Sequence, residues 1–133
     1  MAGPLAAFAP LLGHCFAATL MPEVVDTHCF TDVYQGAHVR DVHVVTTKGK
    51  QSYAGETLYS YDGKVIRFTY VNSLGGVGYG SATVADRTIA FAGSMQAAPG
   101  GASIPIRTDW TLSGSGYSVA APGKPATRFT RVP

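Results

Sequence analysis

Residues 52–73, SYAGETLYSYDGKVIRFTYVNS, contain the strongest fold signal in the chain. The pair Asp62-Gly63 favours a two-residue hairpin turn, because that turn needs positive φ at both central residues. Such a turn places Tyr61 opposite Lys64 and Tyr59 opposite Ile66. Side chains alternate between the two faces of each strand. One face therefore carries four aromatic rings that we expect to point inward, those of Tyr53, Tyr59, Phe68 and Tyr70.

Tyrosines that point inward need hydrogen-bond partners for their hydroxyls, which implies a polar or wet cavity. Gly55 shares their face and leaves room for the ring of Tyr70. Glu56, Lys64 and Arg67 are expected in solvent. The hairpin is thus predicted to form one wall of a cavity.

Short runs rich in Val, Thr, Tyr and Phe follow one another along the chain, separated by turn residues, and helical periodicity is nearly absent. The ten runs are 14–20, 24–34, 37–46, 52–61, 64–73, 77–85, 88–95, 104–112, 117–120 and 126–132. Successive hairpins make an antiparallel meander, which avoids exposed edges by closing into an up-and-down barrel. A two-sheet sandwich is the alternative.

We therefore predict an all-β, single-domain protein over residues 1–133, an up-and-down barrel of about ten strands. Residues 1–13 would form a plug segment and residues 14–133 the barrel. Pro10 limits the plug to one or two helical turns.

Charge and hydropathy exclude several partners. The 133 residues carry a net charge of +2 with 14% charged residues, and no basic stripe predicts binding to nucleic acid. The longest apolar stretch, from Leu5 to Met21, is broken by Pro10 and Gly13, so no membrane span is expected. A basic segment is missing after Met1, so the start is not an intact signal peptide. A mature N-terminus would look the same, which leaves localisation open and favours a periplasmic or secreted protein in that case.

A second predicted hairpin, around Gln35-Gly36, brings histidines together. Its register places His28 opposite His43 and Phe30 opposite Asp41, with Asp26 on the same face. A three-residue loop over residues 21–23 would add Cys15 opposite Cys29 and His14 beside His28. The two cysteines fit either a disulfide or two buried thiols.

The sequence leaves two orientations open for this wall. Apolar content alone favours burial of the face that carries the cysteines with Val33, Val42 and Val44. The gathering of Phe30, Val39 and Val45 with the histidines is typical of a pocket with a few convergent polar groups. We expect the histidine face to point inward.

His28, His43 and Asp41 could form an acid–base set, since a carboxylate beside an imidazole orients the ring and holds its tautomer. A structural pair, or two surface histidines, is the alternative. The same residues with His14 could ligate a metal, but HxxxH and CxxC spacings are absent. We therefore expect neither a metal nor a cofactor. Trp110 belongs to the core or to a ligand-stacking wall, and Asn72 either binds a ligand at the rim or caps a turn.

The order of these parts resembles the calycins, in particular small lipocalin-like and nitrobindin-like barrels. The resemblance rests on Leu11-Leu12-Gly13 before the first strand, the long meander, and Arg128-Phe129-Thr130-Arg131 in the last strand. The tryptophan common after the family's glycine is replaced by Cys15 or Phe16, and haem is disfavoured because no histidine follows His43. Residues 26–30, 40–43 and 53–57 are similar to a bacterial, often exported, subgroup, which implies an envelope setting and the disulfide.

These observations predict a barrel that binds a small apolar or aromatic molecule, as a monomer or homodimer. The predicted lining is Tyr53, Tyr59, Phe68, Tyr70 and Trp110, with Asn72 at the rim. The alternative is a cofactor-independent lyase, isomerase or cyclase that uses His28 and His43 as its acid–base pair. A structural module with a solid core is a third possibility.

Overall fold

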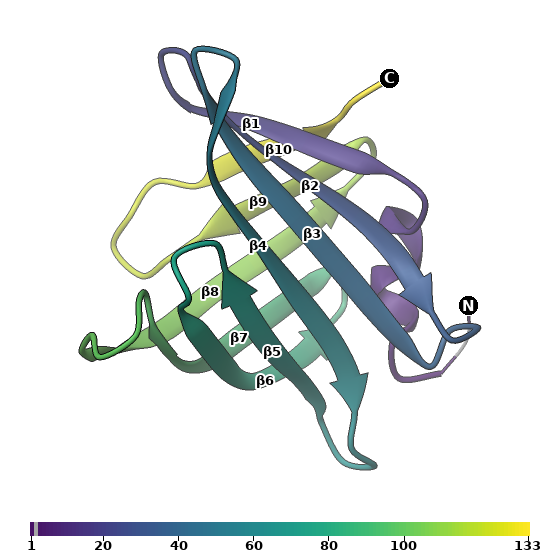
Figure 1. Ribbon diagram of the computed structural model, residues 1–133. Coiled ribbons are helices and arrows are strands. Elements are labelled where there is room, and N and C mark those ends of the chain that lie inside the picture. Colours follow the sequence, from purple (N-terminus) through teal and green to yellow (C-terminus); the bar gives the residue numbers. More distant parts are fainter. Residues whose placement is uncertain (2) are drawn as a thin grey trace.

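The chain forms a closed antiparallel barrel with a short 3-10 helix, η1, before it (Figure 1). The computed structural model describes residue 1 and residues 3–133. Each strand pairs with its neighbours in sequence, and β1 closes the barrel on β10, as predicted for an up-and-down meander. The elements are η1 Ala6–Leu11, β1 Cys15–Met21, β2 Val24–Val33, β3 His38–Thr47, β4 Lys50–Tyr61, β5 Ile66–Asn72, β6 Val77–Ala85, β7 Thr88–Gln96, β8 Ser103–Ser113, β9 Gly116–Ala120 and β10 Thr127–Arg131.

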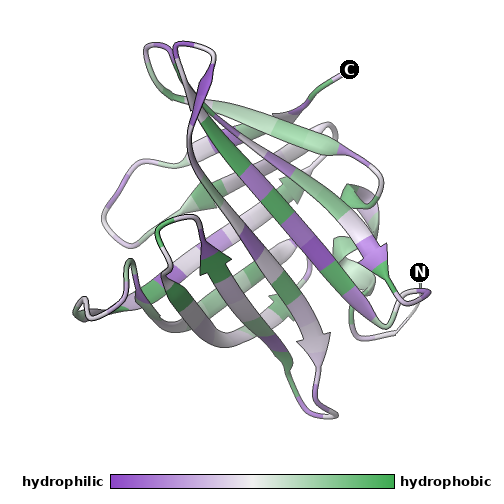
Figure 2. Cartoon of the chain, viewed as in Figure 1, coloured by the Kyte–Doolittle hydropathy of each residue, from purple (hydrophilic) through white to green (hydrophobic). Residues whose placement is uncertain are grey.

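The core is a set of aromatic and aliphatic side chains on the inward face of nearly every strand. Figure 2 shows green and purple bands along β3, where the polar Asp41 is 2% exposed on the inward face and Val42 is 37% exposed on the outward face. Tyr117 is wholly buried and stacks between Trp110 and Phe129, with ring centroids 4.8 and 5.1 Å away. Such ring pairs add stability beyond the area they bury, so these stacked rings help to hold the strands together.

The helix η1 closes one end of the barrel, as the sequence predicts for its plug. Phe8 is fully buried and its ring stacks on that of Tyr59 at 4.5 Å, while Leu11 is buried beside it. Gly13 has φ of +78°, a value that favours glycine, and its N–H donates to the carbonyl of Phe30. This turn directs the chain from the plug into β1.

The hairpin at Asp62-Gly63 has a longer loop than predicted. Tyr61 pairs with Ile66, not Lys64, so the loop has four residues and the predicted two-residue turn is wrong. The Asp62 carboxylate explains the loop, because it accepts the N–H groups of Lys64 and Val65 at 2.9 Å each. The register is displaced by two residues, which is one side-chain period, so every side chain stays on its predicted face.

The second hairpin has the predicted pairing, with His28 opposite His43 and Phe30 opposite Asp41. Its histidine face points into the barrel, as expected, since Phe30 and Asp41 are only 1% and 2% exposed. Cys15 lies opposite Cys29 on the outward face, and the two form a disulfide.

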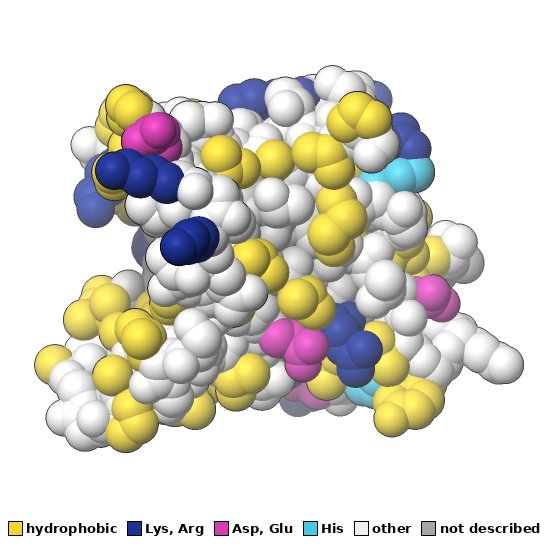
Figure 3. Space-filling model, turned by 45° about the horizontal axis from the view of Figure 1, so that its top comes forward, with side chains coloured by type: hydrophobic (Ala, Val, Ile, Leu, Met, Phe, Trp, Pro, Cys, Tyr) yellow, Lys and Arg dark blue, Asp and Glu magenta, His cyan; other side chains and the backbone are white. Residues whose placement is uncertain are grey.

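Charged side chains of both signs are scattered over the surface in Figure 3. On the outer wall Arg40 pairs with Glu56, and at the end of the β4–β5 hairpin Arg67 pairs with Asp62. Among the described residues, no helix has the length and apolar character needed to cross a membrane.

Candidate functional site

Gly55 creates the space in which the site forms. It lies opposite His43 in the β3–β4 ladder and opposite Asn72 in the β4–β5 ladder. The Tyr70 ring, two residues before Asn72 on the same face, occupies the space beside it. A Cβ atom at Gly55 would lie 2.6 Å from His43 Nε2 and 2.7 Å from Tyr70 Cε1, far inside contact distance. The missing side chain therefore lets the His43 ring and the Tyr70 hydroxyl meet at 3.0 Å, the function of Gly55 that the sequence predicts.

Seven side chains from β2 to β5 form a continuous line of hydrogen bonds, which we call the interior polar chain. Tyr53 Oη lies 2.5 Å from Tyr70 Oη, which lies 3.0 Å from His43 Nε2. His43 Nδ1 lies 3.0 Å from Asp26 Oδ1, and Asp26 Oδ2 lies 3.2 Å from His28 Nε2. His28 Nδ1 then lies 2.7 Å from Asp41 Oδ1, and Tyr59 Oη lies 3.3 Å from Asp41 Oδ2.

Two buried carboxylates determine the charge of this chain. Burial alone would lower the pKa of His28, but the charge of Asp41 and hydrogen bonds to Asp26 and Asp41 outweigh it and raise the pKa to about 9. Burial would raise the pKa of Asp26, yet hydrogen bonds from His28 and His43 hold it well below its usual range. At neutral pH the cation of His28 thus lies between the carboxylates of Asp26 and Asp41.

These charges fix the direction of the hydrogen bonds. The His28 cation donates from both ring nitrogens, one to each carboxylate. Asp26 also accepts the Nδ1–H of His43, so in a neutral His43 ring Nε2 accepts the O–H of Tyr70. Burial and the neighbouring Tyr53 raise the pKa of Tyr70, which keeps its hydroxyl protonated. The chain therefore presents Tyr70 as a neutral phenol backed by a histidine and a carboxylate.

A pocket of about 140 Å³ adjoins the interior polar chain at Tyr70 and Tyr59. Four residues that the sequence predicts as ligand-binding line it, and four more that it did not single out complete the wall. The predicted ones are Tyr59, Phe68, Tyr70 and Trp110, and the others are Thr57, Phe91, Ile106 and Thr108. Thr57 could have been found, because it alternates with Tyr59 on the inward face of the same predicted strand.

Two other predicted ligand-binding residues lie outside the lining of this pocket. Tyr53 reaches it only through the hydroxyl of Tyr70. Asn72 organises the loop after β5: its Oδ1 accepts the N–H groups of Leu74 and Gly76, and its Nδ2 donates to the Ala97 carbonyl. The turn-capping role weighed from the sequence therefore accounts for the contacts of Asn72.

His14 does not join the histidine pair, contrary to the prediction. Phe16 lies directly opposite His28 in the ladder, and His14 lies just before the first residue of β1. The His14 ring lies 2.7 Å from Arg131 Nη2 of β10 and edge-on to Phe16. Arg131 becomes the partner of His14 because β10 closes the barrel against β1, a pairing that the predicted register of the first hairpins does not include.

A larger cavity, of about 460 Å³, lies between η1 and the adjacent strand ends. Its lining includes Ala7, Leu11, Phe16, Arg87 and Leu112. None of the described residues that line it belongs to the interior polar chain. We therefore place the candidate site at the smaller pocket, where aromatic walls meet buried titratable groups.

The side chains of Asp26, His28 and His43 are also arranged as a metal could use them, since one ligand atom from each lies within 4.8 Å of the others. Comparison of the chain with known protein families and with curated proteins found no match. What the fold and site define is thus a class: a closed antiparallel barrel with a buried chain of hydrogen-bonded titratable side chains beside an aromatic pocket.

Proposed function

We propose that the barrel binds a small molecule with a single aromatic ring in the pocket beside Tyr70. The observation that carries the proposal is the lining of that pocket, in which five aromatic rings surround a space of about 140 Å³. Apolar cavities of about 150 Å³ hold one benzene molecule. Small closed barrels commonly hold one ligand, and the resemblance to lipocalin-like calycins supports the same assignment.

The ligand would carry one polar group. Four of the lining residues carry hydroxyls, namely Thr57, Tyr59, Tyr70 and Thr108, and the two tyrosines are part of the interior polar chain. A buried hydroxyl or carbonyl needs such partners, because leaving it unpaired costs free energy. Phenols and aryl ketones or aldehydes fit this chemistry better than benzene does.

Trp110 provides the readout for a binding test, because it is the only tryptophan and it lines the pocket. Titration with phenol should change its fluorescence to saturation. Thr57→Phe fills the pocket and should abolish this signal, whereas Thr83→Phe, at an exposed position of β6, should leave it unchanged. Circular dichroism checks that both variants fold. An equal phenol affinity in the Thr57→Phe variant would overturn the proposal.

A second candidate, proton transfer on the bound ligand, is favoured by one specific contact. Tyr70 lines the pocket and its hydroxyl donates to His43 Nε2, while His43 Nδ1–H donates to Asp26. Tyr70 could take a proton from the α-carbon of an aryl ketone as it passes its own to His43, and the reverse steps return a proton to the enolate. No oxidant or second substrate is needed.

Solvent deuterium exchange at the methyl group of acetophenone, followed by NMR, tests this second candidate. The wild type should accelerate the exchange, and His43→Gln should abolish the acceleration. His38→Gln is the matched control, since His38 forms a hydrogen bond with Ser60 and is not part of the interior polar chain. Exchange at the uncatalysed rate in the wild type would overturn the candidate and leave ligand binding as the function.

A further inference from the structure

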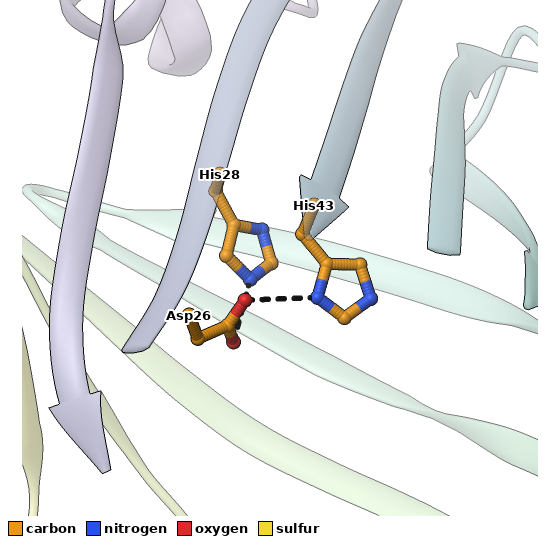
Figure 4. A group of neighbouring side chains, drawn as sticks. All are labelled: Asp26, His28 and His43. Carbon is orange, nitrogen blue, oxygen red and sulfur yellow. Dashed lines mark hydrogen bonds and ion pairs between the residues drawn. The ribbon is translucent and has the colours of Figure 1, made fainter. Parts of the chain in front are cut away.

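Asp26, His28 and His43 converge on one point from two adjacent strands of the barrel wall (Figure 4). We propose that these three side chains bind a divalent first-row transition metal ion, with zinc as the representative ion. His28 Nε2, His43 Nδ1 and a carboxylate oxygen of Asp26 would be the ligands. This site is separate from the aromatic pocket and does not depend on what the pocket binds.

Each imidazole has an oxygen of Asp26 at nearly the spacing that two ligands of one metal require. Zinc lies about 2.0–2.1 Å from nitrogen and oxygen ligands, so neighbouring ligands in a tetrahedral site are about 3.4 Å apart. Asp26 Oδ2 is 3.2 Å from His28 Nε2, and Asp26 Oδ1 is 3.0 Å from His43 Nδ1. These two contacts use different oxygens of Asp26, and one ligand atom from each of the three residues lies within 4.8 Å of the others. The imidazole rings stack with centroids 4.5 Å apart, so they must tilt toward each other for both nitrogens to bind one ion.

The far side of each imidazole already has the partner that a metal-binding histidine needs. A ligating histidine usually donates its other N–H to a carboxylate or another acceptor, which holds the ring in place. His28 Nδ1 lies 2.7 Å from Asp41, which is 2% exposed and also accepts from Tyr59. His43 Nε2 lies 3.0 Å from the Tyr70 hydroxyl. Both outer contacts are therefore preformed.

Charge favours the same occupant. Asp26 and Asp41 are two carboxylates inside the barrel, and a divalent cation between the histidines would balance both. The metal would take the place of the proton on His28 Nε2, and the proton of His43 would move to Nε2 and bond the Tyr70 oxygen. Two imidazoles with one carboxylate suit zinc, iron, cobalt or nickel, whereas calcium and magnesium prefer oxygen ligands.

Three protein ligands leave the fourth position of the ion for water or a small anion. The side chains of Asp26, His28 and His43 are 12%, 16% and 12% exposed, so an ion can reach them from solvent. Because the metal and the proton relay use the same nitrogen of His43, metal-bound protein would lack the relay proposed above. The aromatic pocket would stay open in either state.

Isothermal titration of chelator-treated protein with zinc chloride tests the site. We expect one ion per chain in the wild type, an affinity at least 100-fold lower in His43→Gln and His28→Gln, and a 10- to 100-fold loss in Asp41→Asn. His14→Gln and His38→Gln should bind zinc as the wild type does, because both residues lie outside the cluster. Magnesium chloride should give no binding heat.

NMR of the histidine ring nitrogens in the wild type gives a second readout, which does not depend on whether any variant folds. Zinc should shift the ring nitrogens of His28 and His43 and leave those of His14 and His38 in place. Shifts at His14 or His38 instead, or zinc binding no tighter than millimolar, would overturn the proposal. Thr57→Phe separates the two sites, since it should abolish phenol binding and leave zinc affinity as in the wild type.

Discussion

Gly55 on β4 lies directly opposite His43 on β3, and the bare backbone at Gly55 is what allows His43 to reach Tyr70. The buried histidine pair is thereby connected to a pocket that it does not itself line. The link between the interior polar chain and the aromatic pocket therefore depends on this arrangement.

Gly55→Ala should disrupt the site from its centre. The added Cβ would lie 2.6 Å from His43 Nε2, so the rings of His43 and Tyr70 must separate. We expect a loss of about 1–3 kcal/mol in the free energy of unfolding, as for other overpacked interiors. Urea unfolding measures this loss. If Gly55→Ala unfolds at the same urea concentration as the wild type, the prediction is wrong and the two rings have room to move apart.

Stability should fall with rising pH because of His28. Its folded pKa of about 9 exceeds the ordinary value of about 6.5, so the proton is bound more tightly in the folded state. This stabilisation is complete below about pH 6.5 and is lost as the pH rises through 9, amounting to about 3 kcal/mol. Urea unfolding at pH 6.5 and 9.5 should show the loss in the wild type and in His14→Gln. A loss of the same size in His28→Gln would contradict the assignment.

Tyr117→Phe should stabilise the protein. The Tyr117 hydroxyl is buried and has no hydrogen-bond partner among the described residues, a situation that costs about 1–3 kcal/mol. The variant keeps the ring stacked between Trp110 and Phe129 and should gain about 1 kcal/mol. Tyr59→Phe is the matched control, because it removes a hydroxyl that donates a hydrogen bond to Asp41, and this variant should be less stable than the wild type. Thermal unfolding of both variants gives the comparison, and a less stable Tyr117→Phe would refute the prediction.

The disulfide between Cys15 and Cys29 should contribute substantially to stability. It closes a loop with a sequence separation of 14 residues, for which the chain-entropy account gives about 3 kcal/mol. A double variant, Cys15→Ala with Cys29→Ala, should unfold at lower urea concentration by roughly that amount. Reductant should lower the stability of the wild type similarly and leave the double variant unaffected. A double variant as stable as the oxidised wild type would contradict this account.

Local patterns in the sequence were enough to predict the strands, the inward tyrosines and the pairing of His28 with His43. These features depend on side-chain alternation and on turn residues close in the chain, so the two-residue error at Asp62 did not change which faces are buried. The partner of His14 and the contribution of Phe91 and Ile106 to the pocket depend on how distant strands close the barrel. Periodicity carries no information about that closure. A metal was discounted from the sequence because HxxxH and CxxC spacings are absent, although the predicted hairpin does place Asp26, His28 and His43 on one face.

The most direct test of the central claim compares phenol with benzene as ligands of the wild type and of Tyr70→Phe, using the fluorescence of Trp110. If the Tyr70 hydroxyl meets the polar group of an aromatic ligand, phenol should bind more tightly than benzene to the wild type. Tyr70→Phe should then weaken phenol binding about 5- to 10-fold, the loss expected for one hydrogen bond, and leave benzene binding unchanged. Equal losses for both ligands, or no binding of either, would contradict the claim that this pocket and the interior polar chain form one site.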